Sequence, residues 1–161
     1  MVVTAWHKRV QKHIIKIGEQ SPNRFRRVYN DRRPIHLNHP MKKTAPLFYF
    51  PDARYETKTG RLYLFEVMDT EVGSQAQVVA HVLEACFTPQ ALKVFFIVRS
   101  ERELNIVAHI TEIVMAKLSD MSRDALNKRI RFYHLVITPR DSKSKQRVAE
   151  ILQETRRVPV Q

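Results

Sequence analysis

The sequence predicts a single α/β domain in which helices flank a mixed central β-sheet. Its 161 residues, 43% of them hydrophobic, are enough for one core and too few for two independent domains. Segments with a helical spacing of apolar residues alternate with short β-rich segments, an order typical of a sheet covered by helices. The chain has 3 glycines, which excludes a glycine-rich dinucleotide fingerprint and a P-loop. We therefore expect residues 1–161 to form one domain.

The first third of the chain predicts a basic amphipathic helix followed by a polar, proline-containing segment. Apolar residues recur at helical spacing over Val3–Ile17, and basic residues occupy the other faces. Gly18 is expected to end this helix. The polar stretch Ser21–Lys43 predicts a short strand near Phe25–Tyr29.

The middle of the chain predicts a β-hairpin, and the second half alternates helices with strands. Leu47–Glu56 and Arg61–Met68 are rich in aromatic and aliphatic residues, and Thr57–Gly60 has the length and the glycine of a hairpin loop. The later elements are expected as a helix over Val72–Phe87, a strand over Leu92–Val98, a helix near Glu101–Leu118, a strand near Ile130–Ile137 and a helix near Lys143–Arg156. A hairpin that leads into right-handed crossover units implies a mixed sheet.

Positive charge is concentrated in a basic N-terminal part, residues 1–61. These residues include 14 basic and 4 acidic side chains, whereas residues 62–161 include 14 basic and 12 acidic ones. Such clustering favours a polyanionic partner over a surplus that serves solubility alone. Without a helix-turn-helix or zinc-finger pattern, we expect contacts with phosphates rather than base edges. The candidate nucleic-acid-binding residues are Lys8, Arg9, Lys12, Lys16, Arg24, Arg26, Arg27, Arg32, Arg33, Lys42 and Lys43.

Other features of the composition predict a soluble, cytoplasmic protein. Cys86 is the single cysteine, so neither an intramolecular disulfide nor a thiolate-rich zinc site is expected. The charged segment Met1–Lys16 lacks an uninterrupted apolar stretch, so we expect neither a signal peptide nor a membrane span. The sequence leaves a homodimer and a larger nucleoprotein assembly open.

Two acidic residues on the predicted hairpin are the candidate metal ligands and catalytic residues. Asp52 follows Pro51 on the first strand, and Glu66 lies on the second. If the strand register brings the two carboxylates together, their like charges favour a shared cation, and Mg²⁺ or Mn²⁺ prefers carboxylate oxygens. Such an ion could activate a water for attack on a phosphodiester. In the other interpretation, Pro51-Asp52 is a turn and Glu66 pairs with Arg54 or Arg99.

The pattern resembles the PD-(D/E)XK signature of restriction-type endonucleases, archaeal Holliday junction resolvases and nuclease subunits of heteromeric transposases. Pro51-Asp52 is followed, after 13 intervening residues, by Glu66-Val67, and the resemblance covers residues 3–99. It implies a restriction endonuclease-like core of order α-β-β-β-α-β, extended here by C-terminal β and α elements. It also implies DNA, in duplex or branched form, as the partner, and a metal-dependent DNA endonuclease in which Asp52 and Glu66 bind Mg²⁺ or Mn²⁺.

The sequence departs from this signature at Met68, which stands where the family has a catalytic lysine. A thioether carries no positive charge and donates no hydrogen bond to a phosphate oxygen. Arg54 is the candidate catalytic replacement because it lies two residues after Asp52 on the same predicted strand face. The resemblance further implies helper residues on the following helix, where Gln77 and His81 share a face that a solvated helix would equally explain.

Three functions remain open from the sequence. The first is a metal-dependent nuclease with an atypical site, and the second is a catalytically inactive, nuclease-derived DNA-binding module. The third is a structural RNA-binding protein in which Asp52 and Glu66 lie far apart.

The resemblance also implies an acidic helper residue near the start of the first helix. Glu19 is a poor match for it, because Glu19 lies near the end of the first predicted helix.

Overall fold

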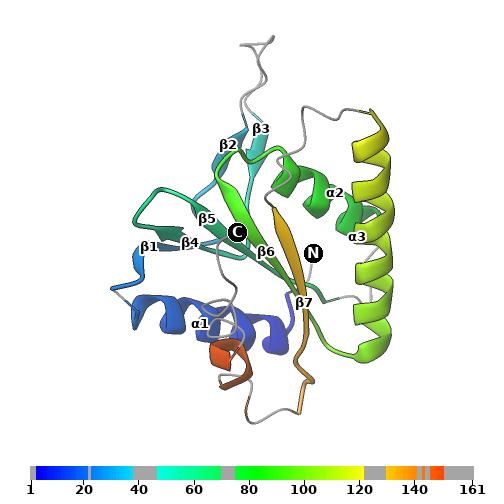
Figure 1. Cartoon of the computed structure of the whole chain (residues 1–161). Helices are drawn as coiled ribbons and strands as arrows, with labels where there is room; N and C mark the ends of the chain where they lie inside the picture. The colour runs from blue at the N-terminus through cyan, green and yellow to red at the C-terminus, as the bar shows by residue number, and fades with distance from the viewer. Residues whose placement is uncertain are drawn as a thin grey trace.

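A computed structural model describes residues 3–21, 23–37, 47–69, 75–121, 130–140, 143 and 146–150 of the chain. These residues form a five-stranded sheet with helices on both faces and a separate two-stranded sheet (Figure 1). The elements are α1 (Ala5–Glu19), β1 (Phe25–Asn30), β2 (Ile35–Leu37), β3 (Leu47–Tyr49), β4 (Ala53–Thr57), β5 (Leu62–Val67), α2 (Gln75–Cys86), β6 (Ala91–Val98), α3 (Glu101–Met121) and β7 (Arg131–Val136). The mixed α/β fold predicted from the sequence is confirmed at this level.

The central sheet has the strand order β1-β4-β5-β6-β7 and is mixed. Strands β1, β4 and β5 pair antiparallel, whereas β5, β6 and β7 pair parallel. Parallel neighbours need crossover connections, and α2 and α3 lie in the two crossovers. Helix α1 packs on one face of the sheet, and α2 and α3 pack on the other (Figure 1).

Strand β5 separates two hydrophobic layers because its side chains alternate between the faces of the sheet. Phe65 and Val67 pack in the layer that α1 covers, whereas Leu64 and Met68 pack in the layer that α2 and α3 cover. All β5 residues are buried, as expected for a central strand with helices on both faces. Even-numbered β5 residues therefore face α2 and α3, and odd-numbered β5 residues face α1.

The predicted strand over Leu47–Glu56 is wrong, because the chain changes sheet in its middle. Its first part is β3, which pairs with β2 in the small sheet, and its second part is β4, which starts only at Ala53. Pro51 between them has no N–H to donate to a ladder. Asp52 makes a bend, and its carboxylate accepts a hydrogen bond from the backbone N–H of Val67 in place of a backbone pair.

Gly18 does not end the first helix, since α1 continues through Glu19. A Cβ atom at Gly18 would lie 2.4 Å from Cε1 of Tyr55, a fully buried ring. The Tyr55 hydroxyl donates a hydrogen bond to the carbonyl of Ile14, one turn earlier on the same helix. Gly18 is thus required for close packing of α1 on β4 rather than for a left-handed cap.

The predicted hairpin loop between β4 and β5 is confirmed. Gly60 has a φ of 76°, a left-handed conformation that favours glycine.

The helix expected near residues 143–156 is described only at 143 and 146–150. Residues 146–150 are helical, and the remainder of the expected helix lies outside the described residues. Among the described helices, none is both long and apolar enough to cross a membrane.

Candidate functional site

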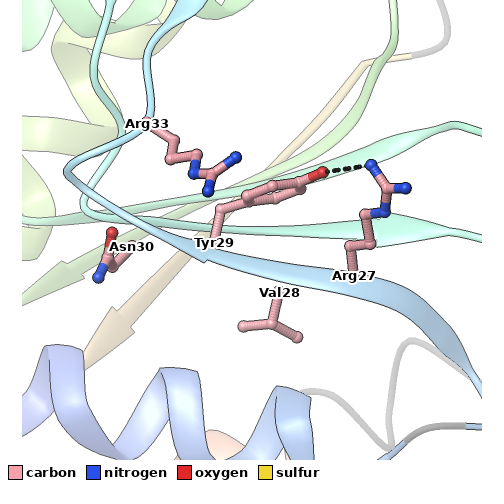
Figure 2. A pocket seen from close by; sticks show the side chains of 5 residues that line it. All are labelled: Arg27, Val28, Tyr29, Asn30 and Arg33. Carbon is pink, nitrogen blue, oxygen red and sulfur yellow. Dashed lines mark hydrogen bonds between the residues drawn. The ribbon is translucent and has the colours of Figure 1, made fainter.

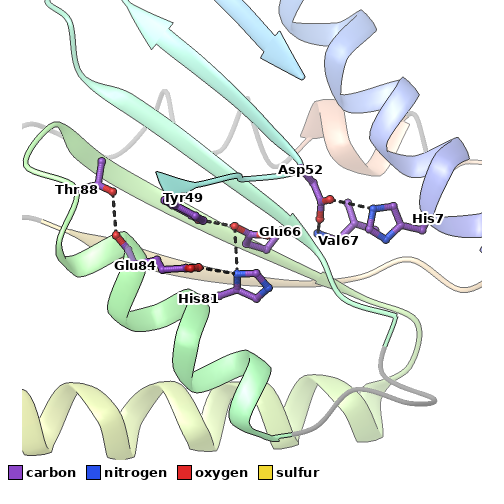
Figure 3. Close-up of polar contacts among 8 residues, drawn as sticks. All are labelled: His7, Tyr49, Asp52, Glu66, Val67, His81, Glu84 and Thr88. Carbon is purple, nitrogen blue, oxygen red and sulfur yellow. Dashed lines mark hydrogen bonds and ion pairs between the residues drawn. The ribbon is translucent and has the colours of Figure 1, made fainter. Parts of the chain in front are cut away.

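Asp52 lies at the sheet edge where β4 begins and β5 ends, beside the start of α1. Its Oδ1 is 3.0 Å from Nε2 of His7, and its Oδ2 accepts a hydrogen bond of 2.7 Å from the Val67 N–H (Figure 3). Gln11 donates a hydrogen bond of 2.8 Å to the backbone carbonyl of Asp52. The Asp52 side chain is 17% exposed. These contacts join the Pro51-Asp52 bend to α1 and to β5.

Nearby acidic groups favour the charged form of His7. Burial lowers the pKa of His7, but the hydrogen bond and charge of Asp52, with Asp69 adding to them, outweigh burial and raise this pKa above its usual value. When His7 is protonated, its imidazolium therefore forms an ion pair with Asp52. It supplies a positive charge next to this carboxylate from an element that the sequence motif does not include.

A second ion pair lies at the carboxyl ends of β5 and β6. Nη1 of Arg99 is 2.8 Å from Oδ1 of Asp69. The Arg99 guanidinium also lies over the ring of Trp6 in α1, 5.7 Å from its centroid. Arg99 thus pairs with Asp69, not with Glu66 as one interpretation of the sequence proposed.

Glu66 has its contacts on the opposite face of the sheet, the face that α2 covers. Its carboxylate is 2% exposed and accepts a hydrogen bond from the Tyr49 hydroxyl of β3. Nδ1 of His81 lies 3.6 Å from the same Glu66 oxygen and 3.2 Å from Oε2 of Glu84 (Figure 3). Glu66 therefore connects β5 to β3 and to α2 through a buried polar network.

Burial controls the protonation of this network. It raises the pKa of Glu66 to about 8, although the charge of His81 opposes the shift. Burial also lowers the pKa of His81, but the charge of Glu66 and the contact with Glu84 outweigh it and raise this pKa to about 8. Burial raises the pKa of Tyr49, so its hydroxyl remains a donor. Glu66 and His81 therefore both titrate slightly above neutral pH.

Asp52 and Glu66 are neighbours in strand register but have different partners. Ala53 pairs with Phe65 at the end of the β4–β5 ladder. Asp52 and Glu66 therefore stand opposite each other at the next position along the two neighbouring segments. The Asp52 carboxylate turns to His7 of α1, however, whereas the Glu66 carboxylate turns to His81 of α2. Among the described residues, no cluster of three or more His, Cys, Asp or Glu side chains is suited to hold a metal ion. A metal shared by these carboxylates would require them to exchange their present partners.

The structure places the other residues of the motif away from these contacts. Arg54 faces Tyr29 across the β1–β4 ladder, with its guanidinium carbon 4.2 Å from the centroid of that ring. Met68 is 3% exposed and packs in the layer covered by α2 and α3. Gln77 is half-buried on α2. The charged neighbour of Asp52 is thus His7.

The predicted basic surface divides into separate parts. A groove of about 480 Å³ between α1 and the turn after β1 is lined by Lys8, Gln11, Lys12, Ile15, Lys16, Glu19, Asn30, Asp31 and Arg32; we call it the α1 groove. Arg27 and Arg33 line a different pocket, on β1. Arg9 donates a hydrogen bond of 2.6 Å to the carbonyl of Pro139, and Arg24 lies over the ring of Phe25. Arg26 is exposed, and Lys42 and Lys43 lie outside the described residues.

His7 and Gln11 are site residues that the sequence did not predict. Both contact Asp52 from α1, through the side chain and the backbone carbonyl respectively. They are four residues apart and therefore share a helix face. A polar pair at this spacing on an otherwise apolar and basic helix is the signal that could have identified them.

Comparisons of the chain with protein-family models, with curated proteins and with solved structures found no match.

Proposed function

We propose that this chain binds nucleic acid through the phosphate backbone, with DNA as the expected partner and the α1 groove as the main contact surface. The observation that carries the proposal is the gathering of Lys8, Lys12, Lys16 and Arg32 along one groove of about 480 Å³. The three lysines are exposed, and they are spaced four residues apart on one face of α1.

The shape of this charge distribution suits a polymer of phosphates better than a small anion. Four residues of an α-helix rise about 6 Å, so the lysines extend positive charge over about 12 Å along α1. Glu19 and Asp31 also line the groove, but the basic residues outnumber them. Cations in a row contact successive phosphates without reading bases, which favours affinity over sequence specificity.

Replacing Lys8, Lys12 and Lys16 together by glutamine is expected to weaken binding of duplex DNA about 10–100-fold, equally for unrelated sequences. The plot of log affinity against log salt should also become shallower, by about 0.9 for each phosphate contact that is removed. Fluorescence anisotropy across a salt series measures both quantities.

A matched triple variant controls for the loss of net charge. Lys58, Arg102 and Arg140 are exposed and lie outside the α1 groove. Their joint replacement by glutamine should leave the affinity and the salt slope close to those of the wild type. Equal losses in the two triple variants would mean that net charge, and not the α1 groove, determines binding.

The order of elements supports a nuclease-like origin for this binding domain. Without the small sheet, the chain runs α1, β1, β4, β5, α2, β6, which is the α-β-β-β-α-β order that the resemblance implies. The separate partners of Asp52 and Glu66 favour a binding module over turnover, because both carboxylates already hold protein groups.

A metal-dependent DNA endonuclease is the second candidate, since Asp52 and Glu66 stand opposite each other just beyond the last β4–β5 pair, Ala53 and Phe65. For this activity we expect calorimetric binding of Mg²⁺ or Mn²⁺ and plasmid cleavage that depends on the same ion. Asp52→Asn should reduce cleavage about 100-fold or more, because it removes a charged ligand oxygen. Arg102→Gln is the control variant. Absence of both metal binding and cleavage in the wild type would leave the binding module as the function.

A further inference from the structure

A pocket of about 510 Å³ lies on the edge strand β1 and is lined by Arg27, Val28, Tyr29, Asn30 and Arg33; we call it the β1 pocket. Figure 2 shows Val28 directed toward α1, whereas Arg27, Tyr29 and Arg33 lie on the other side of the strand. Strand alternation explains this, since Val28 faces Tyr55 in the α1 layer. The β1 pocket and the α1 groove thus lie on different faces of the sheet.

Tyr29 is held in a fixed position at the centre of the β1 pocket. Arg27 donates a hydrogen bond of 3.3 Å to the Tyr29 hydroxyl, which in turn donates one of 3.3 Å to Glu56. Arg54 stacks on the ring from the neighbouring strand β4. Tyr29 therefore orders two guanidinium groups around it, from β1 and from β4.

The described residues that line the pocket include two arginines, Arg27 and Arg33, and no acidic side chain. Arg54 and Glu56 do not line the pocket; they contact the ring and the hydroxyl of Tyr29 from β4. Burial lowers the pKa of Arg54, and the charge of Arg33 lowers it further against the opposing charges of Tyr29 and Glu56. An anion between the Arg27 and Arg33 side chains would offset the positive charge of the pocket.

We propose that the β1 pocket binds a phosphomonoester dianion, carried at the end of a nucleic-acid strand. The two guanidinium groups that line the pocket, those of Arg27 and Arg33, carry two positive charges, and a phosphomonoester carries about −1.5 to −2 at pH 7. An internal phosphodiester carries a single negative charge and would leave the pocket charged. Guanidinium groups present paired N–H donors that match phosphate oxygens, whereas an ammonium acts as a point charge. The assignment of this phosphate to the end of a nucleic-acid strand rests on the proposed nucleic-acid binding.

The pocket lies beside the chain segment that leads to the α1 groove. Asn30, at the end of β1, lines both the β1 pocket and the α1 groove. Arg32 of the turn lines the groove, and Arg33, the next residue, lines the pocket. A strand whose backbone follows the α1 groove can therefore bring its end around the edge of the sheet into the β1 pocket.

The test compares short single-stranded DNA oligonucleotides that carry a 5′-phosphate, a 3′-phosphate or hydroxyl groups at both ends. We expect one of the phosphorylated ends to bind about tenfold more tightly than the unphosphorylated strand, because charged hydrogen bonds are gained. Arg33→Gln and Arg27→Gln should remove this preference, and each should weaken binding of the phosphorylated strand more than binding of the unphosphorylated strand. Both side chains are exposed, so both variants are expected to fold. Arg102→Gln is the matched control and should keep the preference.

Free nucleoside monophosphate and inorganic phosphate, titrated by calorimetry, distinguish a strand end from a free phosphomonoester. If free monophosphate binds as tightly as the phosphorylated strand, the ligand of the pocket is not specifically the end of a nucleic-acid strand. Equal affinity for all three oligonucleotides, unaffected by Arg33→Gln, would overturn the pocket itself.

The triple lysine variant separates this inference from the proposed function. It should weaken phosphorylated and unphosphorylated strands by the same factor and preserve their ratio. If no oligonucleotide binds but free monophosphate binds in a manner that depends on Arg33, the nucleic-acid function fails and the phosphate chemistry of the pocket stands.

Discussion

Met68→Lys is expected to lower the free energy of unfolding by about 3–5 kcal/mol, the usual effect of leaving an uncompensated charge in a protein interior. Met68 is 3% exposed and belongs to the hydrophobic layer that includes Val78 and Val82 of α2. A lysine there would have to lose its proton or displace α2. The melting temperature should fall by about 6–20 °C, at about 2–4 °C for each kcal/mol.

Met68→Leu is the control for this experiment, because it conserves volume and should cost less than about 1.5 kcal/mol. The comparison also tests the resemblance to PD-(D/E)XK nucleases, in which a lysine at this position serves the reaction. A Met68→Lys protein that is as stable as Met68→Leu and gains metal-dependent cleavage would show that the side chain reaches the Asp52 site. This result would contradict the packing described here.

Gly18→Ala should destabilise the protein by about 2–3 kcal/mol, the upper part of the range for an overpacked core. In an unpacked helix the same change would stabilise by about 1 kcal/mol, because alanine has the higher helix propensity. Here the added Cβ would lie 2.4 Å from Cε1 of Tyr55, whose ring is fully buried between α1 and β4. Thermal or urea unfolding gives the difference from the wild type.

A double-mutant cycle with Tyr55→Leu identifies the cause. The smaller side chain removes the ring atoms that the new methyl group would meet, so Gly18→Ala should be neutral or stabilising in the Tyr55→Leu background. A cost that persists there would place the strain elsewhere, and a wild-type background that tolerates Gly18→Ala would show that α1 can move away from β4.

The sequence alone determined the elements whose local residue pattern indicates their conformation and burial. The continuous apolar run of β6 predicts a strand covered on both faces, and Ala91–Val98 is such a strand. Gly60 and its neighbours predict the hairpin turn. The four-residue spacing of the lysines on α1 is enough to place them on one side of a helix.

The sequence did not determine which elements pair or which side chains meet. Leu47–Tyr49 has a strand composition whichever sheet it joins, and only its pairing with β2 separates it from β4. Gly18 has the composition of a helix end, and only the Tyr55 ring on a strand far along the chain explains it.

The candidate site shows the same division at the level of single residues. The sequence placed Asp52 and Glu66 on two adjacent strands, and their positions in the register are indeed neighbouring. The direction of each carboxylate depends on partners that are distant in sequence, His7 for Asp52 and His81 for Glu66. Strand alternation fixes a side chain only within a ladder, and Asp52 precedes its ladder at a bend after Pro51. Tertiary contacts with α1 therefore decided where Asp52 points, and the local pattern could not.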